Sequence, residues 1–166
     1  RCSGRMEFGA RALGNRSILA APNDPRVVQK INHAIKMRDF WMPFAPAVLV
    51  EHAEQLIDMP ESLQLSLSPY MMFTFPVKSG EVENIVATTH QTDNTARAQI
   101  VDSSLYPELH DIITRYYERT GIPALLNTSF NLHGHPIVSS AKEAIEVFLQ
   151  SELDVLVIEN IVVGRR

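Results

Sequence analysis

Near residue 121 the sequence changes abruptly from the periodicity of a helix to that of a buried strand. An amphipathic pattern starts at Pro107, and its apolar side chains recur at helical spacing until Gly121, a residue type that commonly ends helices. The apolar run 122–126 follows at once and leads into the polar segment 127–131. A helix that runs directly into a buried strand indicates an α/β protein.

The rest of the sequence supplies further helices and strands. Strand patterns are also expected at 17–21, 47–50, 70–77, 82–87, 96–101, 155–158 and 161–163. Further helices are expected at 25–37, 51–57 and 140–149. The segment 58–69 is expected to be a surface loop. Because hairpin-like and crossover connections both occur, we predict an α/β fold with a mixed twisted sheet and flanking helices.

The composition is that of one ordinary globular domain. The 166 residues are 45% hydrophobic and 20% charged, which suffices for a single sizeable core, so residues 1–166 are expected to form a single domain. No apolar run approaches the ~20 residues that a membrane span requires. The single cysteine, Cys2, excludes an internal disulfide framework and is typical of a reducing compartment such as the cytoplasm. The chain opens on Arg1, which we interpret as a cut from a longer polypeptide.

Charge is distributed unevenly along the chain. The net charge of −4 argues against a general nucleic-acid binder. Residues 1–50 nevertheless carry eight Lys or Arg and three Asp or Glu, whereas 51–166 carry seven and sixteen. Arginine is a good planar donor for phosphate and carboxylate oxygens. The basic first part of the chain therefore favours an anionic ligand, with solvated surface arginines as the alternative.

The opening segment 4–17 combines glycines and arginines at nearly regular spacing. Its members are Gly4, Gly9 and Gly14, and Arg5, Arg11 and Arg16. Glycine-rich backbone amides can form an anion-binding concavity, arginines can hold phosphate oxygens, and Glu7 is expected to orient one of the arginines. The alternative is a loop whose arginines pair with surface acids. The spacing matches neither the Walker motif nor the dinucleotide-binding fingerprint.

Three later positions are candidates for ligand binding. Lys36 ends a predicted helix, where a cation also favours the helix dipole without any function. Arg97 enters a predicted strand beside a polar loop, and a salt-bridged surface arginine is the alternative. Asn127 and Ser129 follow the strand 122–126, and ligands of open α/β sheets lie beyond the carboxyl ends of strands. Ordinary turn chemistry is the alternative for these two residues.

The histidines do not predict a metal site. His133 and His135 flank a glycine, but the neighbouring sequence lacks the further ligands that a metal normally takes. We interpret this pair as a surface turn. A structural or hydrogen-bonding role is expected for His90.

Taken together, these segments resemble the C-terminal domain of the O-carbamoyltransferase family of the NodU and tobramycin carbamoyltransferase type. The resemblance extends from Gly4 to Gly164 and is carried chiefly by the opening motif Gly-Arg-Met-Glu-Phe-Gly-Ala-Arg-Ala-Leu-Gly-Asn-Arg-Ser-Ile. The segments Pro-Phe-Ala-Pro at 43–46, Thr-Ala-Arg at 95–97 and Leu-Asn-Thr-Ser-Phe-Asn at 126–131 follow in the family's order.

This resemblance implies a YrdC-like α/β domain that binds carbamoyl phosphate and ATP with Mg²⁺. The family forms a carbamoyl-adenylate and releases phosphate and pyrophosphate. An N-terminal actin-like domain of the same polypeptide, which holds iron, then transfers the carbamoyl group to an acceptor hydroxyl. Residues 1–166 do not include that domain, so neither the acceptor site nor the iron is expected in them.

The resemblance also implies roles for five residues of this chain. Arg11 and Arg97 are expected to clamp phosphate groups. Lys36 is expected to neutralise charge in the adenylyl-transfer transition state. Lys36 and Arg97 are therefore the candidate catalytic residues. Asn127 and Ser129 are expected to bind carbamoyl or phosphate oxygens.

One position departs from the family's pattern in a way that bears on binding. Met42 stands directly before Pro-Phe-Ala-Pro, where many relatives have an arginine. If that arginine binds phosphate, this chain lacks one donor. Two other functions remain open on the sequence alone. The first alternative to the enzyme is a YrdC-like module that binds RNA or a nucleotide without turnover. The second is a regulatory or assembly domain that has lost its chemistry.

Overall fold

A four-stranded mixed sheet organises the computed structural model, which describes residues 1–36, 42–60 and 68–165. Its strands lie in the order β1 (Ser17–Ala20), β6 (Ala124–Ser129), β2 (Ala45–Leu49) and β5 (Gln99–Val101). β6 pairs antiparallel with both β1 and β2, whereas β2 and β5 are parallel. The predicted mixed α/β architecture is therefore confirmed.

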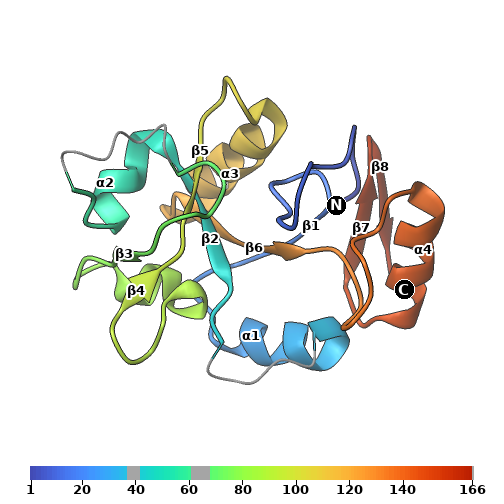
Figure 1. Ribbon diagram of the computed structural model, residues 1–166, viewed down its shortest axis with the longest axis horizontal. Coiled ribbons are helices and arrows are strands. Elements are labelled where there is room, and N and C mark those ends of the chain that lie inside the picture. Colours follow the sequence, from blue (N-terminus) through green and yellow to red (C-terminus); the bar gives the residue numbers. More distant parts are fainter. Residues whose placement is uncertain (37–41, 61–67, 166) are drawn as a thin grey trace.

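The remaining elements lie around this sheet and include two separate two-stranded sheets. They are α1 (Arg26–Ile31), the π-helical turn η1 (Asn32–Lys36), η2 (Val50–His52), α2 (Ala53–Leu56), β3 (Phe75–Pro76), the 3₁₀-helical η4 (Val82–Thr88), β4 (Thr95–Ala96), α3 (Pro107–Thr120), α4 (Ala141–Gln150), β7 (Val155–Ile158) and β8 (Ile161–Gly164). The region of α2, β3 and β4 lies at one end of the molecule, and α4 with the β7–β8 hairpin lies at the other (Figure 1). None of the described helices combines the length and apolarity needed to cross a membrane.

The two longest helices begin and end as their sequences indicate. α3 has proline in its first turn, and Gly121 follows it in the left-handed conformation with φ of 74°. At the start of α4, the Ser140 hydroxyl accepts a hydrogen bond from the backbone N–H of Glu143. The Glu143 carboxylate in turn accepts from the backbone N–H of Ser139, which satisfies another amide at this helix end.

The central strand β2 is buried along its whole length because the sheet has a packed cluster on each face. Beneath α3, one cluster is formed by Ala47, Leu49, Val101, Leu109, Ile113 and Leu125. On the opposite face, a second cluster includes Val48, Ile57, Ile85, Ile100 and Ala124. Successive strand residues point to opposite faces, so neighbours in β2 and β5 enter different clusters. The sheet therefore holds the end of β6 in a rigid setting.

Several predicted boundaries are wrong, and one of them matters for the site. The expected strand 82–87 is 3₁₀-helical, and the expected strand 70–77 is reduced to Phe75–Pro76. The helix expected over 25–37 changes after Ile31 into the wider π-helical turn. β6 continues to Ser129, so Asn127 and Ser129 lie on the strand rather than in a loop. Residue 37 of that helix and most of the expected loop 58–69 lie outside the described residues.

Candidate functional site

A small pocket lies at the carboxyl end of β6 and brings together four of the five residues singled out in the sequence. It has a volume of about 40 Å³, and its walls include Arg11, Arg97, Asn127 and Ser129. A single water molecule needs roughly 10–15 Å³ on this measure, so the pocket suits a ligand group of a few atoms. The described residues of its lining include two arginines and no carboxylate. The described walls therefore favour an anion.

Lys36, the fifth residue, lies beside this pocket and is almost completely buried. Its Nζ donates to Ser129 Oγ at 3.1 Å, to Asn131 Oδ1 at 2.6 Å and to the Asn131 carbonyl at 3.2 Å. Ser129 Oγ also donates to Asn131 Oδ1 at 2.6 Å. π-Helical turns often occur at functional sites, and η1 ends on this lysine. The ammonium is thus hydrogen-bonded to a hydroxyl that lines the pocket.

Asn127 is held in one orientation by a buried network of side-chain amides. Its Nδ2 donates to the Ala12 carbonyl at 3.0 Å and to Gln99 Oε1 at 2.8 Å. Gln99 Nε2 then donates to the Leu13 carbonyl at 3.0 Å. Asn127 Oδ1 is buried and accepts no hydrogen bond within the described structure. This side-chain oxygen is therefore available to accept a hydrogen bond from an N–H group of a ligand.

Gln99 is a positioning residue that the sequence interpretation missed. It lies in β5 with no exposed surface, and its side chain joins Asn127 of β6 to Leu13 of the opening loop. A glutamine in a strand of otherwise apolar, buried residues is the signal that points to such a role, because a buried amide requires partners. It fixes the wall of the pocket to the sheet.

Arg11 and Arg97 approach the pocket from different segments. Arg11 is an exposed side chain of the opening loop, and Arg97 is half-buried between β4 and β5. Arg97 also lines a neighbouring cavity of about 500 Å³, together with Met42, Phe44 and His90. Since Arg97 borders both spaces, one guanidinium can contact groups in the small pocket and in the larger cavity.

The larger neighbouring cavity contains a histidine–aspartate pair. His90 Nδ1 lies 3.0 Å from Asp93 Oδ1. Hydrogen bonds from the Thr95 hydroxyl and backbone N–H hold the pKa of Asp93 below its ordinary value, with the nearby His90 as a smaller cause. Asp93 therefore remains an acceptor near neutral pH. The expectation of a hydrogen-bonding role for His90 is confirmed.

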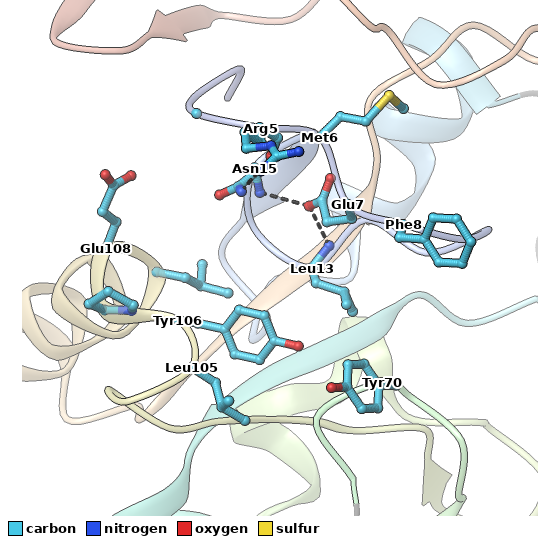
Figure 2. A pocket seen from close by; sticks show the side chains of 13 residues that line it. Arg5, Met6, Glu7, Phe8, Leu13, Asn15, Tyr70, Leu105, Tyr106 and Glu108 are labelled. Atoms are coloured by element: carbon cyan, nitrogen blue, oxygen red, sulfur yellow. Dashed lines mark hydrogen bonds between the residues drawn. The ribbon is translucent and has the colours of Figure 1, made fainter.

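Glu7 organises the opening loop through the backbone, and the expectation that it orients an arginine is wrong. Its Oε1 accepts from the backbone N–H groups of Leu13 and Asn15 at 2.7 and 2.8 Å (Figure 2). It also accepts from the backbone N–H of Arg16 at 3.2 Å. These three amides therefore serve the loop's own structure. A carboxylate satisfies them in the way that a bound anion satisfies the amides of an anion-binding loop.

The arginines of the opening motif have separate roles. Arg16 is buried, and its guanidinium donates to the carbonyls of Ser3, Gly4 and Asn15 at 2.8–3.1 Å. Arg11 is exposed at the mouth of the small pocket. Arg16 therefore stabilises the loop, whereas Arg11 faces the space that a ligand would occupy.

The other histidines do not converge on a metal site. His133 and His135 are exposed in the turn after β6, in agreement with the expected surface turn. Within the described parts of the chain, no three His, Cys, Asp or Glu side chains come together in a way that could hold a metal ion.

Comparison with known proteins places the chain in a family. The family described as "Carbamoyltransferase C-terminus" matches residues 1–165, so the chain belongs to this family. It is 42% identical over 163 residues to nodulation protein NolNO of Sinorhizobium fredii, which covers 98% of this chain and 24% of the relative. Nodulation protein NolO of Bradyrhizobium diazoefficiens is likewise 42% identical over 163 residues, or 98% of this chain and 29% of that protein.

The nodulation protein U of Sinorhizobium fredii is also similar, with 36% identity over 144 residues, 87% of this chain and 25% of that protein. The chain thus spans about a quarter of the length of these relatives. It corresponds to the carboxyl-terminal part of longer carbamoyltransferase-family proteins.

Proposed function

We propose that this chain is the part of an O-carbamoyltransferase that binds carbamoyl phosphate and ATP and joins them into carbamoyl-adenylate. The observation that carries the proposal is the convergence of Arg11, Arg97, Ser129 and Lys36 on one small pocket whose described lining residues include no carboxylate. Family membership supplies the reaction class, and the pocket supplies groups suited to a phosphorylated substrate.

The small pocket provides for both halves of carbamoyl phosphate. The guanidinium groups of Arg11 and Arg97 bind phosphate oxygens, and the Ser129 hydroxyl adds a donor that Lys36 orients. The free acceptor Oδ1 of Asn127 suits the NH₂ of the carbamoyl group, because the Asn127 amide nitrogen already has two partners. Carboxylates, which would repel the phosphate, do not occur among the lining residues that the structure describes.

ATP is assigned to the larger cavity next to the small pocket. The two spaces share Arg97, Pro43 and Phe44, and the larger one adds His90 and Asp93 as hydrogen-bonding groups. In this proposal the α-phosphate of ATP binds near Arg97, and the nucleoside lies beyond it. Met42 lines this cavity where many relatives have arginine, so this member relies more heavily on Arg97.

The reaction then proceeds without a nucleophile from the protein. Water releases phosphate from carbamoyl phosphate, and an oxygen of the resulting carbamate attacks the α-phosphorus of ATP. A new C–O–P linkage forms, and pyrophosphate leaves. Lys36 and Arg97 contribute by holding positive charge next to the developing negative charge, as fixed donors do in other phosphoryl-transfer sites.

Calorimetric titration with carbamoyl phosphate tests the site. We expect Arg97→Ala and Ser129→Ala to weaken binding by at least about tenfold, or ~1.4 kcal/mol. Arg115→Ala is the matched control, because Arg115 lies on the exposed face of α3 and pairs with Asp111. Unchanged affinity in both site variants would refute the placement of the phosphate. Pyrophosphate release from ATP, dependent on carbamoyl phosphate, separates an enzyme from a module that only binds.

A further inference from the structure

A large cavity with an apolar rim lies on the other side of the opening loop. Its volume is about 680 Å³, and it lies between the loop and the start of α3 (Figure 2). We use the term apolar rim for the exposed side chains of Met6, Phe8, Tyr70 and Leu105 that border it. Phe8 is fully exposed to solvent. Exposed apolar patches around a hollow mark surfaces that bind another protein segment.

The exposure of Phe8 is built into the loop. Its immediate neighbour Glu7 accepts hydrogen bonds from three backbone N–H groups of the loop. These bonds fix the backbone on which the exposed Phe8 side chain is carried. Gly4 and Gly9 flank this segment with φ of 55° and 112°, values that favour glycine and let the chain turn on both sides. Specific backbone hydrogen bonds and glycines therefore keep an aromatic side chain exposed to solvent. Such an arrangement is expected where a partner covers that side chain.

The occupant is indicated by the length of the relatives. This chain corresponds to the C-terminal part of proteins about four times as long, of which it spans 24% in the case of NolNO. A longer polypeptide has to contact this part through some surface, and interdomain contacts resemble protein–protein interfaces with aromatic residues at their centre. We propose that the apolar rim is the docking surface for the amino-terminal portion of the same polypeptide, which inserts an apolar segment into the large cavity.

The docking surface is connected to the small pocket by the loop itself. Residues 4–8 border the large cavity, whereas Ala10, Arg11 and Ala12 border the small pocket. The Ala12 carbonyl accepts the hydrogen bond that orients Asn127. Covering Phe8 therefore restricts the segment that carries Arg11, and binding of the amino-terminal portion strengthens binding of carbamoyl phosphate. This coupling rests on the proposed function, whereas the docking surface does not.

Hydroxyl-radical footprinting tests the docking surface on the full-length polypeptide that ends in these 166 residues. We expect Met6, Phe8, Tyr70 and Leu105 to be oxidised at least about fivefold more slowly than in the 166-residue chain, because docking removes them from solvent. Equal rates in both proteins would overturn the proposal. Protection that appears only as the protein concentration rises would assign the surface to a second copy of the chain and would also overturn it.

A variant pair tests the coupling. In the full-length polypeptide, Phe8→Ser is expected to weaken carbamoyl phosphate binding by about tenfold, to the affinity of the 166-residue chain. The same substitution leaves the affinity of the 166-residue chain unchanged, because its Phe8 is already uncovered. Leu149→Ser, which changes an exposed leucine of α4, serves as the control and is expected to change neither.

An equal loss of affinity in both proteins would show that Phe8 acts within the pocket and would refute the coupling. If neither protein binds carbamoyl phosphate, the proposed function fails, and the footprint still decides whether the rim is a docking surface.

Discussion

The small pocket and the large cavity are both bordered by the opening loop, but different interactions form their walls. The polar side chains at the small pocket are held by hydrogen bonds to neighbouring residues. Gln99 and the Ala12 carbonyl bond to Asn127, and Asn131 bonds to Lys36. The large cavity is bordered by apolar side chains that project into solvent. The walls of the small pocket are completed by contacts within this chain, whereas the apolar rim, in our proposal, is completed by another segment. Preorganised polar walls suit chemistry, and unsatisfied apolar walls suit assembly.

The largest expected effect comes from removing the buried ammonium of the small pocket. Lys36→Met is expected to lower the rate of pyrophosphate release by about 100-fold or more, because one fixed positive charge is lost from the transition state. Lys142→Met removes an exposed ammonium from α4 and is expected to leave the rate unchanged. A stopped-flow or coupled assay of pyrophosphate measures both variants. A Lys36→Met enzyme with normal rates would show that the pocket is not the reaction centre.

A smaller effect is expected when the support behind the pocket is removed. Gln99→Leu leaves the Leu13 carbonyl and one Asn127 N–H without their partners, so the free energy of unfolding should fall by about 2–3 kcal/mol. Gln55→Leu is the matched control, because Gln55 is exposed and its side chain contacts His52 at the surface. Urea denaturation of both variants provides the comparison. Equal stability losses would indicate that the Gln99 network does not hold the wall.

The smallest effect concerns the large cavity and appears only at high pH. Burial raises the pKa of the Tyr106 phenol to about 12, with the neighbouring Tyr70 and Glu7 as smaller causes. Between the unfolded value near 10 and this value, the folded chain holds more protons than the unfolded chain. The free energy of unfolding therefore falls as the pH rises through this range and is unaffected below it.

Ultraviolet titration of tyrosinate, compared between the wild-type chain and Tyr106→Phe, measures this pKa. We expect the variant to lack a titration step near pH 12 that the wild-type chain shows. If the variant instead lacks a step near pH 10, Tyr106 is more exposed than the structure indicates. If the amino-terminal portion docks here, its addition should move the step to still higher pH, because burial increases.

The main fold features were predictable where a local pattern decided the structure. The helix that ends at Gly121, the cap formed by Ser140, and the apolar run that became β6 depend on neighbouring residues. The segment around Ile85 was misjudged because its apolar residues suit both a short strand and a 3₁₀ turn. Ile85 itself lies at a kink within η4, with non-helical φ of −133° and ψ of 29°, and packs fully buried in the cluster on this face of the sheet. The local sequence does not report that contact.

The candidate site was predictable in its residues but not in their connections. The motif order pointed to Arg11, Lys36, Arg97, Asn127 and Ser129, and the structure brings them together. By contrast, Arg11 and Arg16 look alike in the sequence, and only the surrounding carbonyls make Arg16 a structural residue. A glutamine in the apolar strand β5 indicates that a buried amide needs partners, but those partners, Leu13 and Asn127, lie in two distant segments and are not evident from the local sequence.

The hydrogen bond between Asn127 and Ala12 has a consequence for how the protein is made. Its two residues are 115 positions apart, and β1 pairs with β6 over a similar separation. Contacts between such distant segments form late, because a long loop must close before they stabilise anything. While the chain emerges from the ribosome, the opening loop must wait for β6 before the small pocket exists. A chain that stops before Ser129 would therefore lack the pocket altogether, and the binding of carbamoyl phosphate would report on completed folding.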